Sequence, residues 1–93
     1  MDEPTPLPIN GVLDLHTFRP DEIGDLIREY VAECRVRDIV QIRIIHGKGT
    51  GQLRHGVHAL LQEMPEVDSF QLADQTSGGW GATVVTLRSR ISS

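Results

Sequence analysis

The chain has 93 residues, of which 39% are hydrophobic and 24% are charged, and its net charge at pH 7 is −4. This length suits one small domain, and the composition is that of a folded globular chain. We expect a single cytoplasmic domain, because the sequence shows no signal segment and no apolar run near the ~20 residues that span a membrane. Cys34, the one cysteine, cannot form an internal disulfide, which suits a reducing compartment.

The charge is distributed unevenly along the chain. Residues 41–58 contain two arginines, one lysine and three histidines but no acid, and residues 75–93 contain two arginines and no acid. Most acidic residues lie in residues 21–38 and 63–74. The net negative charge argues against a strong non-specific nucleic-acid binder, but the two basic segments would form a positive face if they folded together.

The first half of the chain predicts an arm, a strand and a helix. Residues 1–10 contain three prolines and predict a flexible arm, with the domain itself in residues 11–90. Residues 12–16 form a short apolar run that predicts a strand. Pro20 then begins a predicted helix, because the apolar residues from Ile23 to Cys34 recur at helical spacing.

The second half predicts a strand, a helix and two further strands. The β-branched run 39–46 predicts a strand, and a glycine-rich turn at 47–51 follows it. A helical stripe begins at Leu53, and Pro65 ends the helix. Two strands are predicted after it, at residues 69–73 and 82–88.

The predicted order β-α-β-α-β-β defines an α/β fold of the α+β sandwich type, with a four-stranded mixed sheet and two helices. A helical crossover joins the first two strands, so they should be parallel. The last two strands are close in sequence and should pair as an antiparallel hairpin. Both helices should cover the same face of the sheet.

Asp14 and His16 are the first candidates for chemistry. Residues two apart in a strand point the same way, so this pair should share one face and Leu13 and Leu15 the other. A carboxylate beside a histidine fixes the tautomer of the ring and stabilises its imidazolium, as acid–base catalysis requires. A hydrogen-bonded structural histidine is the commoner outcome for this pattern alone.

A second candidate site is the turn His46-Gly47-Lys48-Gly49-Thr50-Gly51. Glycines let backbone N–H groups turn toward an anion, and the following helix adds its positive N-terminal end. Lys48 and Arg54 would add charge, although the order of a Walker loop is absent. The alternative is an ordinary strand–helix turn with an incidental lysine.

A third candidate lies in Gly78-Gly79-Trp80-Gly81-Ala82-Thr83. Trp80, with Gly79 before it, would stack on a splayed base if its ring were exposed. A tryptophan in the core is the alternative, and it is the commoner one.

Together these segments resemble the Smr (small MutS-related) domain family, in its stand-alone form. The family motifs L-D-x-H, H-G-x-G and G-G-x-G-x-T align in order with Leu13–His16, His46–Gly49 and Gly78–Thr83, over most of residues 13–87. The longer form H-G-K-G-T-G-x-L-R is also matched, through Arg54.

The resemblance implies a fold similar to the C-terminal domain of bacterial translation initiation factor three. It implies an endonuclease that nicks or cleaves DNA or RNA, including messenger RNA at stalled ribosomes in some members. Asp14 and His16 match the positions held responsible for cleavage, and Gly47 and Gly49 match the turn tied to nucleic-acid handling. Thr17 departs from the family, where many members have glycine.

These residues suggest a mechanism of phosphodiester cleavage at one shared site. The turn, with Lys48 and Arg54, would hold the phosphate, His16 oriented by Asp14 would move a proton, and His46 on the same side would be a partner acid. RNA is favoured over DNA, because its 2′-hydroxyl is a built-in nucleophile and two histidines would then suffice without a metal. DNA nicking would call for Mg²⁺ or a similar ion, for which Asp14 alone is a poor cage.

Two alternatives remain open at this point. The first is a non-catalytic module that docks on nucleic acid or a ribosome through the same turn. The second is a protein-interaction domain whose working surface is the acidic helix 21–36. We further expect a monomer that has no membrane contact, and we assign no metal-ligating residue.

Overall fold

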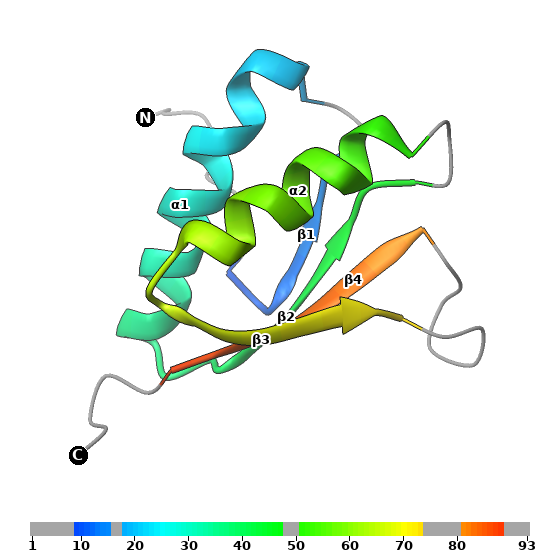
Figure 1. The fold of residues 1–93 in the computed structure, drawn as a ribbon. Coiled ribbons are helices and arrows are strands. Elements are labelled where there is room, and N and C mark those ends of the chain that lie inside the picture. Colours follow the sequence, from blue (N-terminus) through cyan, green and yellow to red (C-terminus); the bar gives the residue numbers. More distant parts are fainter. Residues whose placement is uncertain (1–8, 16–17, 48–50, 74–80, 89–93) are drawn as a thin grey trace, which may run out of the picture.

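The two helical stripes and the β-branched runs form two helices and four strands in the computed structural model (Figure 1). The structure describes residues 9–15, 18–47, 51–73 and 81–88. The elements are β1 (Val12–Asp14), α1 (Pro20–Val36), β2 (Gln41–Ile45), α2 (Gln52–Glu63), β3 (Val67–Leu72) and β4 (Ala82–Leu87). The predicted order β-α-β-α-β-β is therefore confirmed.

The strands form one mixed sheet in the order β1-β2-β4-β3. β1 pairs with β2 in parallel, as the helical crossover requires, and β4 runs antiparallel to both of its neighbours. The parallel pair and the β3–β4 hairpin were predicted, whereas the position of β4 between β2 and β3 was not. Because of that position, the chain around Gly81 lies beside the end of β2.

The strand boundaries differ from the predicted ones by one or two residues. β2 spans Gln41–Ile45, where residues 39–46 were predicted, and β3 and β4 each end one residue before the predicted end. β1 ends at Asp14, where residues 12–16 were predicted; Leu15 follows the strand, and His16 lies outside the described residues. β3 begins at Val67, two residues before the predicted start, and its pairing with β4 is irregular between Val67 and Ser69. At this irregularity the side chains do not alternate regularly between the two faces of the sheet. A search for alternating residues therefore misses the start of the strand.

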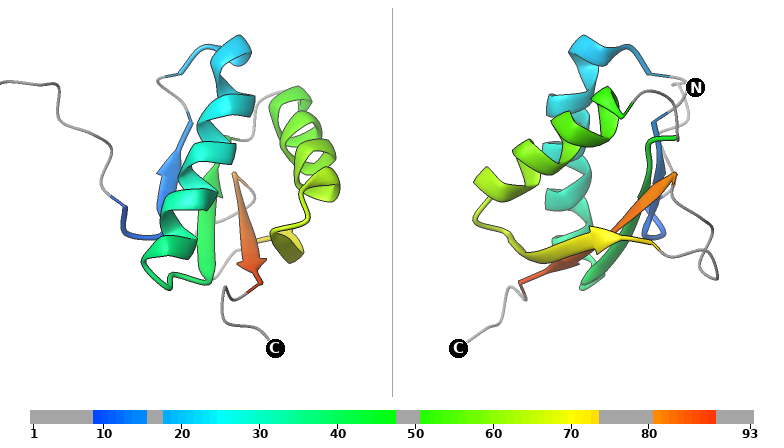
Figure 2. Two further views of the ribbon diagram at one scale, coloured as in Figure 1. Left: turned by 90° about the vertical axis from the view of Figure 1, so that its left-hand side faces the viewer. Right: turned by 45° about the vertical axis from the view of Figure 1, so that its right-hand side comes forward.

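Both helices lie on one face of the sheet, and the core fills the space between them (Figure 2). Ile42 and Ile44 of β2 are fully buried on this face, and Val85 of β4 lies with them. α1 contributes a buried stripe at helical spacing, as predicted: Ile23, Ile27, Tyr30, Val31 and Cys34. The acidic residues of α1 fall off this stripe and are exposed.

The hydroxyl of Tyr30 fastens α1 to the first strand. It accepts a hydrogen bond from the Gly11 amide at 3.1 Å and donates one to the Val12 carbonyl at 3.0 Å. The ring is 3% exposed, and burial raises the pKa of the phenol. The start of the sheet is therefore held to the helix by a side chain as well as by packing.

We expect Tyr30→Phe to lower the free energy of unfolding by about 1–3 kcal/mol, because the buried Gly11 amide loses its acceptor while the ring still packs. Urea denaturation followed by circular dichroism would measure this. A loss below about 0.5 kcal/mol with an unchanged m-value would show that the two hydrogen bonds contribute little.

Candidate phosphate site at the ends of β1 and β2

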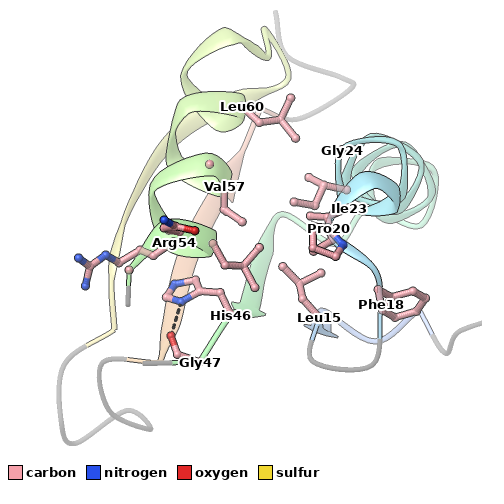
Figure 3. Close-up of a pocket in the computed structure, with 15 residues that line it drawn as sticks. Leu15, Phe18, Pro20, Ile23, Gly24, His46, Gly47, Arg54, Val57 and Leu60 are labelled. Atoms are coloured by element: carbon pink, nitrogen blue, oxygen red, sulfur yellow. Dashed lines mark hydrogen bonds between the residues drawn. The ribbon is translucent and has the colours of Figure 1, made fainter. Parts of the chain in front are cut away.

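The carboxyl ends of the parallel strands β1 and β2 meet at one edge of the sheet. The Leu15 amide donates to the Ile45 carbonyl at 2.9 Å and extends the parallel pairing by one residue. Leu15 and His46 both point from this edge toward the space between the two helices (Figure 3). Ligands of open α/β sheets bind at such an edge.

A cavity of about 670 Å³ opens between α1 and α2 above this edge (Figure 3). His46, Gly47, Gly51 and Arg54 line one part of it. The rest of its wall is mainly apolar and comes from both helices and the segment before α1: Leu15, Phe18, Pro20, Ile23, Ile27, Leu53, Val57 and Leu60. Polar and cationic groups are thus gathered at one side of an otherwise apolar hollow.

His46 and His58 share one buried hydroxyl. The Nε2 atoms of both rings lie 2.8 Å from the Oγ1 of Thr83, which is fully buried. The rings meet edge to face, with their centroids 6.2 Å apart, and Phe70 packs against His58 at 4.9 Å. This hydrogen-bonded cluster joins β2, α2 and β4 beneath the cavity.

The pKa of His58 is lowered from its ordinary value of 6.5. Burial is the largest cause, and electrostatic repulsion from His46, Arg54 and His55 acts in the same direction. His58 is therefore held in its neutral form near neutral pH.

At the start of the turn after β2, Gly47 is in close contact with Gly81, the residue before β4. Gly47 has φ of +81°, which favours glycine, and a Cβ added to Gly81 would lie 3.3 Å from the Gly47 Cα. The amides of His46 and Gly47 both donate to the Gly81 carbonyl, at 2.8 and 2.9 Å. The Gly47 amide is therefore engaged inside the protein, where we had expected it to face an anion.

The N-terminus of α2 carries positive charge without a capping acid. Its N-cap is Gly51, with φ of +89°, and the first turn contains no acidic residue. Among the described residues no side chain forms a capping hydrogen bond with this end. Arg54 lies in the first turn of α2, and a Cβ added to Gly51 would lie 3.1 Å from its Nη2, so the helix dipole and the guanidinium are together at this helix end.

Comparison with known proteins gives the same family as the motifs. The family model "Smr domain" matches residues 13–88. The chain belongs to the Smr domain family. Two endonuclease MutS2 proteins are similar to it, one from Halothermothrix orenii (36% identical over 87% of this chain) and one from Solidesulfovibrio magneticus (39% over 83%). The chain spans about a tenth of the length of these relatives.

Two solved structures share the Smr fold. The Smr domain of Thermus thermophilus MutS2 superposes with a TM-score of 0.79 at 34% identity, covering 85% of this chain and 99% of that one. YdaL, a stand-alone small MutS-related protein from Escherichia coli, gives 0.76 at 26% identity, covering 84% and 64%. The mixed sheet with two helices is therefore the architecture of the family.

The Smr domain does not place Asp14 and His46 on one side of the sheet, so this prediction is wrong. The register pairs Leu13 with Ile44, and both side chains are buried beneath the helices. Asp14 pairs with Ile45 and is exposed on the opposite face, whereas His46 has the parity of Ile44 and is 6% exposed. The sequence left this open because Ile44 and Ile45 are both apolar, so either could have faced the core.

Several predicted site residues of the Smr domain lie outside the described residues. They are His16, Lys48, Gly49, Thr50, Gly79 and Trp80, and with them Thr17, the departure from the family motif. The described candidates are thus Asp14, His46, Gly47, Gly51 and Arg54. Among these, the last four lie together at the cavity.

Sequence reasoning missed Thr83 and His58. Thr83 is the last residue of the third motif, so its place there was a signal that we assigned to no role. His58 follows Arg54 by four residues and therefore shares its side of α2, a spacing that would have brought it toward the site. Within the described residues no group of three or more His, Cys, Asp or Glu side chains is arranged to hold a metal ion.

The lowered pKa of His58 predicts how stability depends on pH. The unfolded chain binds a proton at this histidine more readily than the folded one, so protonation favours unfolding as the pH falls below 6.5. The contribution of His58 is complete above that value and is lost between 6.5 and its lower folded pKa. Urea denaturation from pH 8 to 5 should therefore show a falling free energy of unfolding, and His58→Gln should flatten that slope.

His55→Gln makes the same chemical change at an exposed position of α2 and should keep most of the slope. Equal slopes in the wild type and the His58→Gln variant would contradict the lowered pKa.

Proposed function

We propose that this Smr domain binds a nucleic-acid phosphate at the N-terminus of α2 and cleaves the phosphodiester, with RNA favoured over DNA. The observation that carries the proposal is the helix end at Gly51, which no side chain of the described residues caps, with Arg54 in the first turn, beside the His46–Gly47 corner. An anion at this end would meet backbone N–H groups, the helix dipole and a guanidinium together. The similar MutS2 proteins are named endonucleases, which supports the same chemistry here.

Proton transfer is assigned to Asp14 and His16, the pair that matches the family's L-D-x-H motif. His46 is less suited to it, because both ring nitrogens have partners inside the protein, the Gly47 carbonyl and the Thr83 hydroxyl. We assign His46 instead to holding the start of the phosphate turn. A strand crossing the edge of the sheet would meet Arg54 on the helix side and Asp14 on the open side.

One observation favours the rival proposal, a binding module without catalysis. Asp14 lies on the face of the sheet away from Arg54 and His46, so the acid–base pair and the phosphate site would have to act across the sheet edge. A module that only binds needs the phosphate site alone. The enzyme proposal requires Asp14 and His16 for cleavage, whereas the binding-module proposal gives this pair no role.

Arg54→Gln should weaken binding of a labelled single-stranded RNA by about tenfold, because one charged hydrogen bond to phosphate is lost. It should also reduce the slope of log affinity against log salt by about 1. Arg28→Gln, which makes the same charge change at an exposed position of α1, is the matched control and should leave both values close to those of the wild type. Equal losses in the two variants would assign the effect to net charge and refute a phosphate site at α2.

His16→Ala should slow cleavage of labelled RNA by about 10²- to 10⁴-fold, the usual contribution of a positioned acid or base. Asp14→Asn should slow it as well, because an amide stabilises an imidazolium less than a carboxylate does. The assay would compare single-stranded RNA, duplex DNA and supercoiled plasmid, each with and without EDTA, and affinity should change little. Cleavage that survives both substitutions in nuclease-free protein would leave the binding module as the function.

A further inference from the structure

The hydroxyl of Thr83 lies between two histidine rings and can donate its one hydrogen to only one of them. The Nε2 atoms of His46 and His58 each lie 2.8 Å from its oxygen, and Thr83 is fully buried. A hydroxyl offers one donor and two acceptor sites, so it can donate to one ring and accept from the other. The other contacts of the rings decide which way this pair of hydrogen bonds runs.

The carbonyl of Gly47 decides the direction. It lies 3.0 Å from Nδ1 of His46 and can only accept, so Nδ1 carries a hydrogen. In the neutral ring Nε2 then has a lone pair, and this lone pair accepts the hydroxyl hydrogen of Thr83. With that hydrogen used, Nε2 of His58 has to donate to the Thr83 oxygen.

The hydrogen bonds therefore run in one direction, from His58 through Thr83 and His46 to the Gly47 carbonyl. We propose that Thr83 and His58 are positioning residues that fix His46 as its Nδ1–H tautomer and so hold the Gly47 peptide at the start of the phosphate turn. That they serve nucleic-acid binding rests on the proposed function, whereas the tautomers themselves do not. The direction requires a hydrogen on Nε2 of His58, and because the lowered pKa of His58 favours its neutral ring, Nδ1 of that ring is then bare.

The backbone around Gly47 shows why its carbonyl needs a donor. The amides of His46 and Gly47 are both held by the Gly81 carbonyl, and Gly47 itself has φ of +81°. The Gly47 amide is thus bonded to Gly81, just before β4, and its carbonyl to the His46 ring, so both hydrogen-bonding groups of this residue have partners. The peptide of Gly47 at the end of β2 is thus held in one orientation.

Nitrogen NMR of the histidine rings tests the assignment directly, because protonated and bare ring nitrogens resonate far apart. Above pH 7, His46 should show a protonated Nδ1 and a bare Nε2, and His58 the reverse. His46 observed as the Nε2–H tautomer, or His58 as the Nδ1–H tautomer, would overturn the proposal, whether or not the protein cleaves nucleic acid.

Substitutions of Thr83 separate positioning from packing. Thr83→Val keeps the shape but removes the hydroxyl, so His46 should become a mixture of tautomers, whereas Thr83→Ser should retain the single Nδ1–H form. Thr86→Val makes the same change at a half-buried position three residues further along β4 and should leave both rings unchanged. An unaltered His46 tautomer in folded Thr83→Val would refute the role of the hydroxyl.

Substitutions of His58 test the other end of the cluster. His58→Gln can place an amide N–H near the ring nitrogen it replaces, while His58→Leu cannot donate. We expect His58→Leu and Thr83→Val to weaken RNA binding by about 2- to 10-fold, the worth of one hydrogen bond, and His58→Gln and Thr83→Ser to restore it. The Arg54→Gln variant should lose affinity with its His46 tautomer intact.

The NMR and RNA-binding measurements together distinguish the proposed hydrogen-bond direction from the proposed function. The expected tautomers in a protein that binds no RNA would support the hydrogen-bond direction and refute the proposed function. RNA binding by a protein whose His46 carries its hydrogen on Nε2 would support the proposed function and refute the hydrogen-bond direction. Equal losses of affinity in His58→Leu and His58→Gln, with both variants folded, would show that His58 acts by packing and would refute its positioning role.

Discussion

The candidate site depends on one buried hydroxyl, that of Thr83, which holds a strand, a helix and the start of a turn together. Its partner His46 directly follows β2, its partner His58 lies in α2, and Thr83 itself lies in β4. No backbone ladder connects α2 to the sheet, so these side-chain hydrogen bonds add direction to what is otherwise apolar packing. In a buried position they are strong, and each unpaired nitrogen would carry the full cost of desolvation.

The position of β4 makes this arrangement possible. Because β4 lies between β2 and β3, the chain at Gly81 runs against the end of β2, and its carbonyl receives the amides of His46 and Gly47. The approach is close enough that a side chain at Gly81 would press on the Gly47 backbone. Gly47 of the H-G-x-G motif and Gly81 of the G-G-x-G-x-T motif therefore form one contact.

The elements of the fold could be predicted from the sequence, because helical and strand periods are local signals. The pairing of β4 with β2 could not, since it joins residues about 40 apart and nothing local specifies it. The candidate site was predicted in part for the same reason. Motif glycines and Arg54 were found, whereas Thr83 and His58 act through a contact between distant elements, and the face of His46 depended on which of two adjacent isoleucines entered the core.

Asp14 and His46 lie on opposite faces of the sheet because Ile44, and not Ile45, enters the core. This separation bears on how a small acidic domain could handle a polyanion. The exposed acids of α1 lie on its outer side, away from the stripe that faces the sheet, and the first turn of α2 has none. Under the proposed function, attraction for phosphate is local to the helix end, where a dipole and the Arg54 guanidinium act over a few ångströms, and the net charge of −4 is felt mainly at longer range, where salt screens it. In that proposal the site selects a phosphate by the geometry of its donors, and the contact of the His46 ring with the Gly47 carbonyl holds the peptide at the start of the turn.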